Sequence, residues 1–187
     1  PDDASRWYPG SGIYRNVWLL KTSPVHVEQW GTFVRNVQLN QEKAIMEMGV
    51  NVENHAGKDV QVEVRTGIYL QDENGHPMGD KVAQYITKSI AIKKDSWASA
   101  RFQFEVDAPK LWSIDTPNCY VAVSRIFKDG QEVDCYETPF GIRTIEFTHD
   151  QGFMLNGRKV AIKGVCMHHD LGALGAAFNE VGAERQL

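Results

Sequence analysis

Three adjacent polar side chains, His168, His169 and Asp170, are the residues of this 187-residue chain best suited to chemistry. They follow a short apolar run, and binding groups are often mounted where a strand ends and a loop begins. A metal site finds weak support, because adjacent side chains on an extended segment diverge and no partner cluster occurs elsewhere at ligand spacing. General base catalysis by either imidazole is also weakly supported, since no paired carboxylate or nucleophile motif is visible.

Two interpretations of these three residues remain open from the residue types alone. Imidazole and carboxylate groups together offer donors and acceptors for a hydroxyl-rich ligand such as a sugar. The same groups could instead form a satisfied hydrogen-bonding cluster at the end of a strand. Spacing does not separate the two.

The stretch that must position them runs from residue 140 to residue 170. Residues 142–147 alternate apolar and polar side chains, and two short apolar runs, 153–155 and 160–162, flank Asn156-Gly157. A type I′ turn needs positive φ at both central residues, so Asn-Gly between apolar runs predicts a hairpin.

Farther on, Asn179 is the expected N-cap of a helix that begins at Glu180. A strand, a loop and a helix start indicate the opening βα unit of an α/β barrel.

Before this stretch the chain carries short strands at regular spacing. Residues 60–71 alternate strictly, which indicates a half-buried antiparallel strand. Residues 120–128 are apolar on both faces, as expected of a central strand, and Asp129-Gly130 forms a second hairpin turn. The expected strands are 44–53, 60–71, 82–92, 98–106, 120–128 and 131–137. About seven strands with almost no helical periodicity predict an all-β, two-sheet antiparallel sandwich, immunoglobulin-like in topology without that fold's Cys…Trp…Cys pattern.

The beginning of the chain reads differently. Residues 16–20 and 25–30 look like two short strands, too few to make a sheet of their own. We interpret them as closing strands of an upstream β domain, with residues 32–40 as the crossover into the sandwich. Trp112, in the loop before the central strand, is interpreted as a core anchor. The first residue is Pro1 and the last turns resemble an interrupted helix, so both ends resemble cuts.

Composition narrows the classes of partner. The net charge of −4 gives no electrostatic footprint for nucleic acid, and no basic cluster suits an anionic membrane surface. No apolar stretch is long enough to span a bilayer. The three cysteines, Cys119, Cys135 and Cys166, lack any regular spacing, so we expect reduced, mostly buried thiols, with a Cys119–Cys135 bridge left open. No cofactor or metal is expected.

Four stretches, in this order, resemble the glycoside hydrolase family 2 enzymes, and the β-galactosidases in particular. Residues 5–19 (SRWYPGSGIYRNVWL) are similar to the end of their N-terminal sugar-binding jelly-roll domain. Residues 111–120 (LWSIDTPNCY) and 140–147 (FGIRTIEF) resemble their immunoglobulin-like domain and the strand that leaves it. Residues 152–175 (GFMLNGRKVAIKGVCMHHDLGALG) resemble the start of their catalytic (β/α)8 barrel.

This resemblance implies a retaining exo-glycosidase, in which one Glu acts as acid/base and another as nucleophile. Both would lie beyond Leu187, so the resemblance implies no catalytic residue, and no turnover, in this chain itself. His168 matches a His that helps to hold the sugar, and Asp170 aligns with a polar position of the same loop. His169 beside them, and Arg6 where the first domain leans over the active site, complete the expected substrate-binding set.

The resemblance divides the chain into three parts. Residues 1–33 would end the jelly-roll domain, residues 34–147 would form the immunoglobulin-like sandwich, and residues 148–187 would be a truncated barrel start. The expected partner is a β-galactoside, bound and hydrolysed at terminal non-reducing β-D-galactosyl residues by a longer, soluble parent that is periplasmic or secreted. No nucleic acid or membrane partner is expected, and the truncated ends could self-associate.

The alternative is a non-catalytic immunoglobulin-like module that binds a carbohydrate or a protein. Its support is the sandwich together with three tryptophans that could be exposed, Trp30, Trp97 and Trp112.

Overall fold

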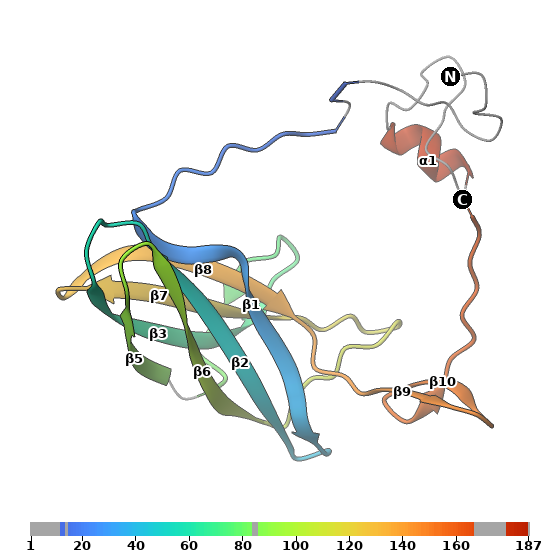
Figure 1. The fold of residues 1–187 in the computed structure, drawn as a ribbon. Helices are drawn as coiled ribbons and strands as arrows, with labels where there is room; N and C mark the ends of the chain where they lie inside the picture. The colour runs from blue at the N-terminus through green and yellow to red at the C-terminus, as the bar shows by residue number, and fades with distance from the viewer. Residues whose placement is uncertain (1–11, 14, 84–85, 167–178, 187) are drawn as a thin grey trace. The chain divides into compact units, whose positions relative to one another are not determined.

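The computed structural model describes residues 12–13, 15–83, 86–166 and 179–186. The chain forms two compact units, of which the larger, Thr22–Ala161, holds every strand (Figure 1). Its strands are β1 (Val25–Leu39), β2 (Lys43–Asn54), β3 (Val60–Gln71), β4 (Pro77–Met78), β5 (Ile86–Ile92), β6 (Ser96–Asp107), β7 (Tyr120–Lys128), β8 (Gln131–Phe140), β9 (Ile145–Thr148), β10 (Gly152–Leu155) and β11 (Arg158–Lys159).

Two antiparallel sheets form the sandwich. One has the order β1-β2-β6, and the other has the order β4-β3-β7-β8, with β5 pairing alongside β3. A separate small sheet of order β11-β10-β9 follows. The predicted all-β, immunoglobulin-like sandwich is therefore confirmed among the described residues.

Apolar and polar side chains alternate along the strands, which places the apolar ones in the core between the two sheets. Val60, Val62 and Val64 of β3 are buried, whereas the residues between them are polar and lie on the other face. Their sheet partner β7 contributes Tyr120, Ala122 and Ile126 to the same core. Because successive side chains of a strand point to opposite faces, each strand needs apolar residues only at every second position.

A tyrosine links the two halves of the sandwich in the manner of immunoglobulin-like folds. Tyr120 begins β7 and is 2% exposed, and its hydroxyl oxygen accepts the backbone N–H of Lys110 at 2.8 Å. This contact ties the loop after β6 to the start of β7, as a tyrosine corner does. The Tyr120 ring also stacks on Phe140, with 5.6 Å between the ring centroids. Burial raises the pKa of the Tyr120 phenol.

Side chains of β8 close the edge at which the two sheets meet. Residues 28–31 of β1 bulge out of the ladder with β2, and the backbone N–H of Val27, just before the bulge, donates to Asp134 Oδ2 at 2.8 Å. The N–H of Trp30 donates to the Tyr136 hydroxyl at 3.3 Å. Trp30 sits at a φ of 58° and is 84% exposed, so it gains no packing that would offset this conformation.

The structure corrects the interpretation of the beginning of the chain. Residues 25–30 and 32–40, predicted as a strand of an upstream domain and a crossover, together form β1 and pair with β2. Residues 25–33 therefore belong to the sandwich. The bulge explains the error, because it interrupts the alternation that would have marked one continuous strand. Residues 16–20, predicted as a strand, adopt no regular structure.

The predictions for the last third of the chain are confirmed in part. Asn156 and Gly157 have φ values of 50° and 73°, so the predicted type I′ hairpin turn is present between β10 and β11. The expected strand at 160–162 does not form, because only Arg158–Lys159 finds a partner strand. Helix α1 (Glu180–Gln186) begins where predicted, and Asn179 Oδ1 accepts the N–H of Gly182 at 2.9 Å as its cap.

Two buried hydroxyl groups satisfy each other inside the core. Thr66 of β3 lies directly opposite Ser124 of β7, both side chains are fully buried, and their oxygens are 2.9 Å apart. A buried hydroxyl without a partner costs free energy, whereas replacing both partners by apolar groups of similar shape can be nearly neutral.

We expect Thr66→Val to lower the free energy of unfolding by about 1–3 kcal/mol, because it leaves the Ser124 hydroxyl unpaired. The double variant Thr66→Val/Ser124→Ala should recover most of that loss. Urea unfolding of the wild type, both single variants and the double variant measures the coupling. A double variant whose loss equals the sum of the two single losses would contradict this account.

Candidate functional site

The predicted sugar-binding residues His168, His169, Asp170 and Arg6 lie outside the described residues. The structure therefore does not place them. It does describe the segment that leads to three of them, from β8 through the small sheet to Cys166. The question at this site is how that segment is attached to the sandwich.

Trp112 forms the first attachment. Its backbone N–H donates to the carbonyl of Ile142 at 2.9 Å, just after β8 ends, and Ile142 is fully buried. The guanidinium carbon of Arg143 lies 4.7 Å from the centroid of the Trp112 ring, within the range of a cation–π contact. A Cβ atom added to Gly141 would lie 2.9 Å from Trp112 Cβ, so only glycine allows this approach.

Asn156 forms the second attachment. Its Oδ1 accepts the N–H of Thr144 at 3.0 Å, and its own N–H donates to the carbonyl of Thr144 at 3.0 Å. Its Nδ2 donates to the carbonyl of Trp112 at 2.9 Å. The turn residue thus binds both the start of β9 and the loop that carries Trp112. We call Gly141, Trp112, Thr144 and Asn156, together with Ile142 and Arg143, the junction.

Sequence reasoning found only part of the junction. Asn156 was predicted as a turn residue. Its hydrogen bonds to Thr144 and Trp112 were missed because no local sequence pattern predicts them. Trp112 was interpreted as a core anchor, but it is only half-buried and packs on the exit from β8. The one usable signal was Gly141 beside an aromatic-rich strand end, which is too common to decide anything.

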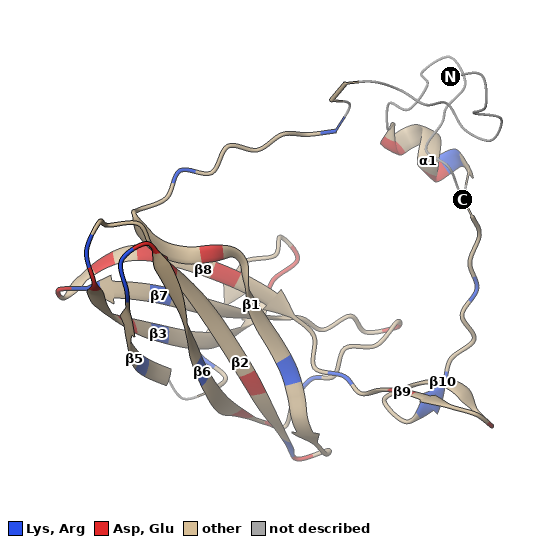
Figure 2. Cartoon of the chain, viewed as in Figure 1, with Lys and Arg blue, Asp and Glu red and all other residues tan. Residues whose placement is uncertain are grey.

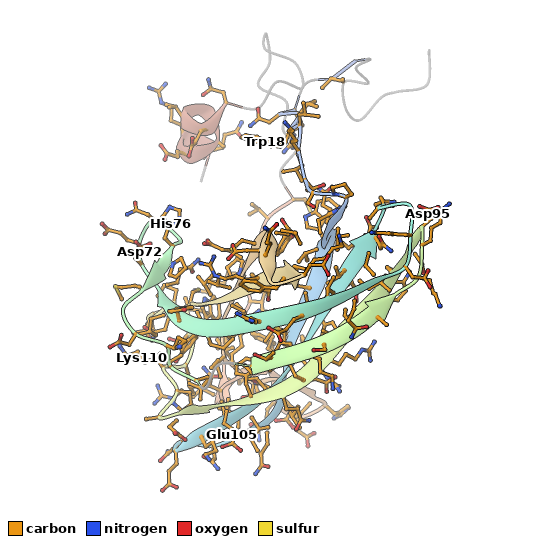
Figure 3. The ribbon with its side chains drawn as sticks, turned by 90° about the vertical axis from the view of Figure 1, so that its left-hand side faces the viewer. Trp18, Asp72, His76, Asp95, Glu105 and Lys110 are labelled. Carbon is orange, nitrogen blue, oxygen red and sulfur yellow. The ribbon has the colours of Figure 1, made fainter. Side chains whose placement is uncertain are left out.

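Many polar groups elsewhere in the described residues are paired within turns and between strands. Asp72 lies in the turn after β3 (Figure 3), and its Oδ1 accepts the N–H groups of Asn74 at 2.9 Å and of His76 at 2.8 Å. Charged side chains of both signs are interspersed over the strands (Figure 2), for example Arg35 with Glu47 at 2.6 Å. These contacts hold turns and strands rather than a ligand.

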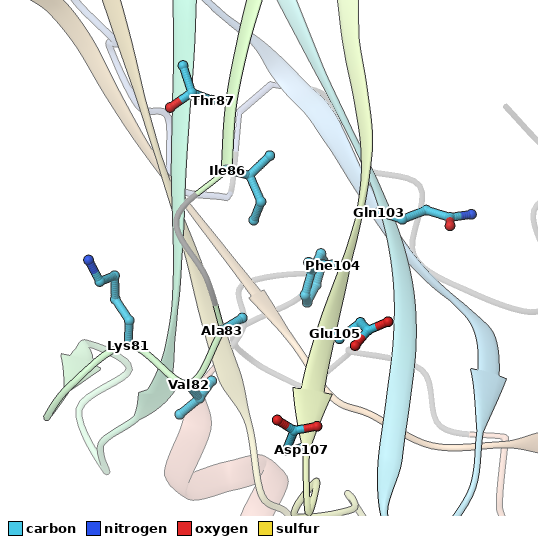
Figure 4. Close-up of a pocket in the computed structure, with 9 residues that line it drawn as sticks. All are labelled: Lys81, Val82, Ala83, Ile86, Thr87, Gln103, Phe104, Glu105 and Asp107. Carbon is cyan, nitrogen blue, oxygen red and sulfur yellow. The ribbon is translucent and has the colours of Figure 1, made fainter.

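A hollow of about 660 Å³ lies between the segment leading into β5 and the end of β6 (Figure 4). It has two carboxylates, Glu105 and Asp107, whose oxygens lie 2.5 Å and 3.7 Å from Lys43 Nζ. The hydrogen bond to Glu105 raises the pKa of the Lys43 amine. Both carboxylates of this hollow are therefore engaged in ion pairs with Lys43.

Other reactive groups are few in the part of the chain that is described. No set of three or more His, Cys, Asp or Glu side chains there is arranged to hold a metal ion. All three cysteines are free thiols, but the expectation that they are mostly buried is wrong, because Cys119 is half-buried and Cys135 and Cys166 are exposed. Partial burial raises the pKa of Cys135; the charge of Arg125 opposes this effect, and the nearby carboxylates reinforce it, so Cys135 is a poor nucleophile at neutral pH. No described helix is long and apolar enough to cross a membrane.

Comparison with known proteins decides the family. The model of the glycosyl hydrolases family 2 matches residues 25–143, from the start of β1 to the junction. The chain belongs to glycosyl hydrolase family 2. The matched region covers the sandwich that the structure shows.

Individual members of glycosyl hydrolase family 2 are similar over almost the whole chain. The β-galactosidase BoGH2A of Bacteroides ovatus is 41% identical over 183 residues, which are 98% of this chain and 21% of that protein. A putative β-glucuronidase of Formosa agariphila is 31% identical over 181 residues, 96% of this chain and 16% of that protein. The crystal structure of a family 2 member from Bacteroides cellulosilyticus superposes with a TM-score of 0.81 at 37% identity, covering 97% of this chain and 22% of that one. The chain thus spans about one-fifth of the length of these relatives.

The close contact between Gly141 and Trp112 can be tested by substitution. We expect Gly141→Ala to lower the free energy of unfolding by about 1–3 kcal/mol, because the new methyl group would collide with the Trp112 side chain at its root, where it cannot rotate away. Gly164→Ala is the matched control, since a Cβ atom there meets nothing within 4 Å. Thermal unfolding of both variants measures the difference, and equal midpoints would contradict the packing described here.

Proposed function

We propose that this chain is a supporting, non-catalytic portion of a longer retaining exo-β-glycosidase that removes terminal non-reducing β-D-galactosyl residues. The observation that carries the proposal is the 41% identity to a β-galactosidase over 98% of the chain. In the proposed mechanism two glutamates outside this chain act as acid/base and nucleophile. No cofactor takes part.

The proposal assigns a role to each part of the chain. Residues before β1 would end a jelly-roll sugar-binding domain, and residues from about 148 onward would begin the catalytic barrel. The sandwich between them would act as a scaffold, and the junction would fix the direction in which the chain enters the barrel. His168, His169, Asp170 and Arg6 would contact the sugar through hydrogen bonds to its hydroxyl groups.

The sugar in this proposal is a neutral galactoside rather than an anionic glucuronide. The relatives include a putative β-glucuronidase at 31% identity as well as a β-galactosidase. A glucuronide differs from a galactoside in carrying a carboxylate, so a glucuronidase pocket needs a cationic partner that a galactosidase does not. The residues proposed here to contact the sugar are two imidazoles, one carboxylate and one guanidinium, a mixture that does not favour an anionic sugar strongly.

Activity assays separate these possibilities. We expect the longer protein to hydrolyse an aryl β-galactoside faster than an aryl β-glucuronide, and the 187-residue chain to hydrolyse neither, because it lacks the two carboxylates. Release of the aryl group is measured with both substrates and both proteins. Turnover by the 187-residue chain, or a preference of the longer protein for the glucuronide, would overturn the corresponding part of the proposal.

The proposed sugar contact of His168 has a direct test. In the longer protein, His168→Ala should lower kcat/KM for the aryl β-galactoside by roughly 10- to 100-fold, the effect of losing one or two hydrogen bonds to substrate. His149→Ala serves as the control, since its side chain is fully exposed and bonds only to Asp150. If the two variants retain equal activity, His168 does not contact the sugar.

A second candidate function is a non-catalytic module that binds a carbohydrate or a protein. The observation that favours it is the exposure of two tryptophans, Trp30 at 84% and Trp97 at 59%. Exposed indole rings can stack on sugars or anchor a protein partner. Titration of the 187-residue chain with galactose and galactosides discriminates, because saturable binding at millimolar concentration or below would support the module, whereas part of a sugar subsite should bind far more weakly.

A further inference from the structure

The small sheet that follows the sandwich has one apolar face. In β9 and β10, Ile145 lies opposite Leu155 and Phe147 lies opposite Phe153. Residues directly opposite each other in an antiparallel pair point to the same face, and so do alternate residues of one strand. The rings of Phe147 and Phe153 are in contact, with 5.2 Å between their centroids. We call Ile145, Phe147 and Phe153 the hairpin face.

The opposite side of the same sheet is different in character. It carries Glu146 opposite Met154 and Met154 opposite Lys159. The sheet is therefore amphipathic along β9 and β10, with charged groups on one side and mainly aromatic and aliphatic groups on the other. Arg158, opposite Leu155, adds one charge to the apolar side at its turn end. This pattern is typical of a sheet that covers an apolar surface with one face only.

Most of the hairpin face is nevertheless uncovered. Leu155, near the junction, is only 5% exposed, but Ile145 is 53% exposed and Phe147 is 73% exposed. The strands of this sheet have four, four and two residues. Sheets this small are not stable in water unless a face packs against something else. The described residues supply that packing at Leu155 and not at Phe147.

We propose that the hairpin face docks against an apolar surface of the catalytic domain within the same polypeptide. This inference rests on the proposed glycosidase parent. About four-fifths of each relative named above lies outside the region matched by this chain, so ample chain exists to supply the surface. The boundary between the two units falls between Ala161 and Ile162, only a few residues after the hairpin face. The apolar side chains of Ile162 and Val165, which come next, are also exposed, at 72% and 79%.

Size and connectivity favour this occupant over a second copy of the chain. Three apolar side chains bury far less than the roughly 1,200 Å² that a stable interface between separate molecules needs. A surface joined by a short connection, in contrast, is present at an effective concentration in the millimolar range, so even a small patch stays occupied. A second copy at micromolar concentration cannot compete with it.

Thiol labelling measures whether the face is covered. Phe147→Cys places a thiol on the hairpin face, and Glu146→Cys places one on the opposite side of the same strand. We expect the thiol at position 147 to react with a maleimide about tenfold or more slowly in the longer protein than in the 187-residue chain. The thiol at position 146 should react at the same rate in both. Mass spectrometry of the peptide that contains residues 145–148 separates this reaction from those of Cys119, Cys135 and Cys166.

Each outcome has a definite meaning. Equal labelling at position 147 in the two proteins would overturn the proposal, because the face would then be open in both. Protection in the 187-residue chain that grows with its concentration would also overturn it, in favour of a second copy. Ile145→Cys, a milder replacement on the same face, repeats the measurement if Phe147→Cys fails to fold. Labelling does not depend on turnover, so an inactive but protected longer protein would disprove the proposed function and leave the docking intact.

Discussion

Two antiparallel sheets can hold this chain together only if every strand offers apolar side chains at alternate positions, because only one face of each sheet meets the other. The strands meet this constraint with small and medium side chains, mostly valine, on β2 and β3, and with Tyr120 and Phe140 where the sandwich ends. One polar pair, Thr66 with Ser124, interrupts the apolar layer and is tolerated because its two hydroxyl groups bond each other. The outer faces are left free to carry charge pairs such as Arg35 with Glu47.

The junction attaches the segment that follows β8 to the sandwich. A strand that simply ended at Phe140 would leave the following hairpin free to pivot. Instead, Gly141 lies against Trp112, and Asn156 binds the backbone on both sides of the exit, at Thr144 and at Trp112. These contacts set the direction in which the small sheet leaves the sandwich.

Much of the fold could be predicted from the sequence because it depends on local patterns. Strict alternation marked β3, Asn156-Gly157 and Asp129-Gly130 marked turns that indeed have positive φ at both residues, and Asn179 marked the helix cap. What failed depends on contacts between distant residues. The bulge at 28–31 concealed a single long strand as two pieces, and the backbone N–H of Trp30 within it donates to Tyr136 of β8, about a hundred residues away. The attachment of Asn156 to Trp112 was hidden for the same reason, and the sugar-binding loop lies outside the described residues.

The contact between β1 and β8 also affects how readily the protein aggregates through an edge strand. Edge strands with free N–H groups can recruit strands from other molecules and so begin aggregation. Here the N–H groups of Val27, just before the bulge, and of Trp30, within it, donate to Asp134 and Tyr136, so side chains of β8 occupy these two donors of the β1 edge. The side chains accept these bonds without forming a ladder, which leaves no regular template for an incoming strand. Concentrated solutions of this sandwich should therefore resist fibril growth from that edge, even though an indole ring stands exposed beside it.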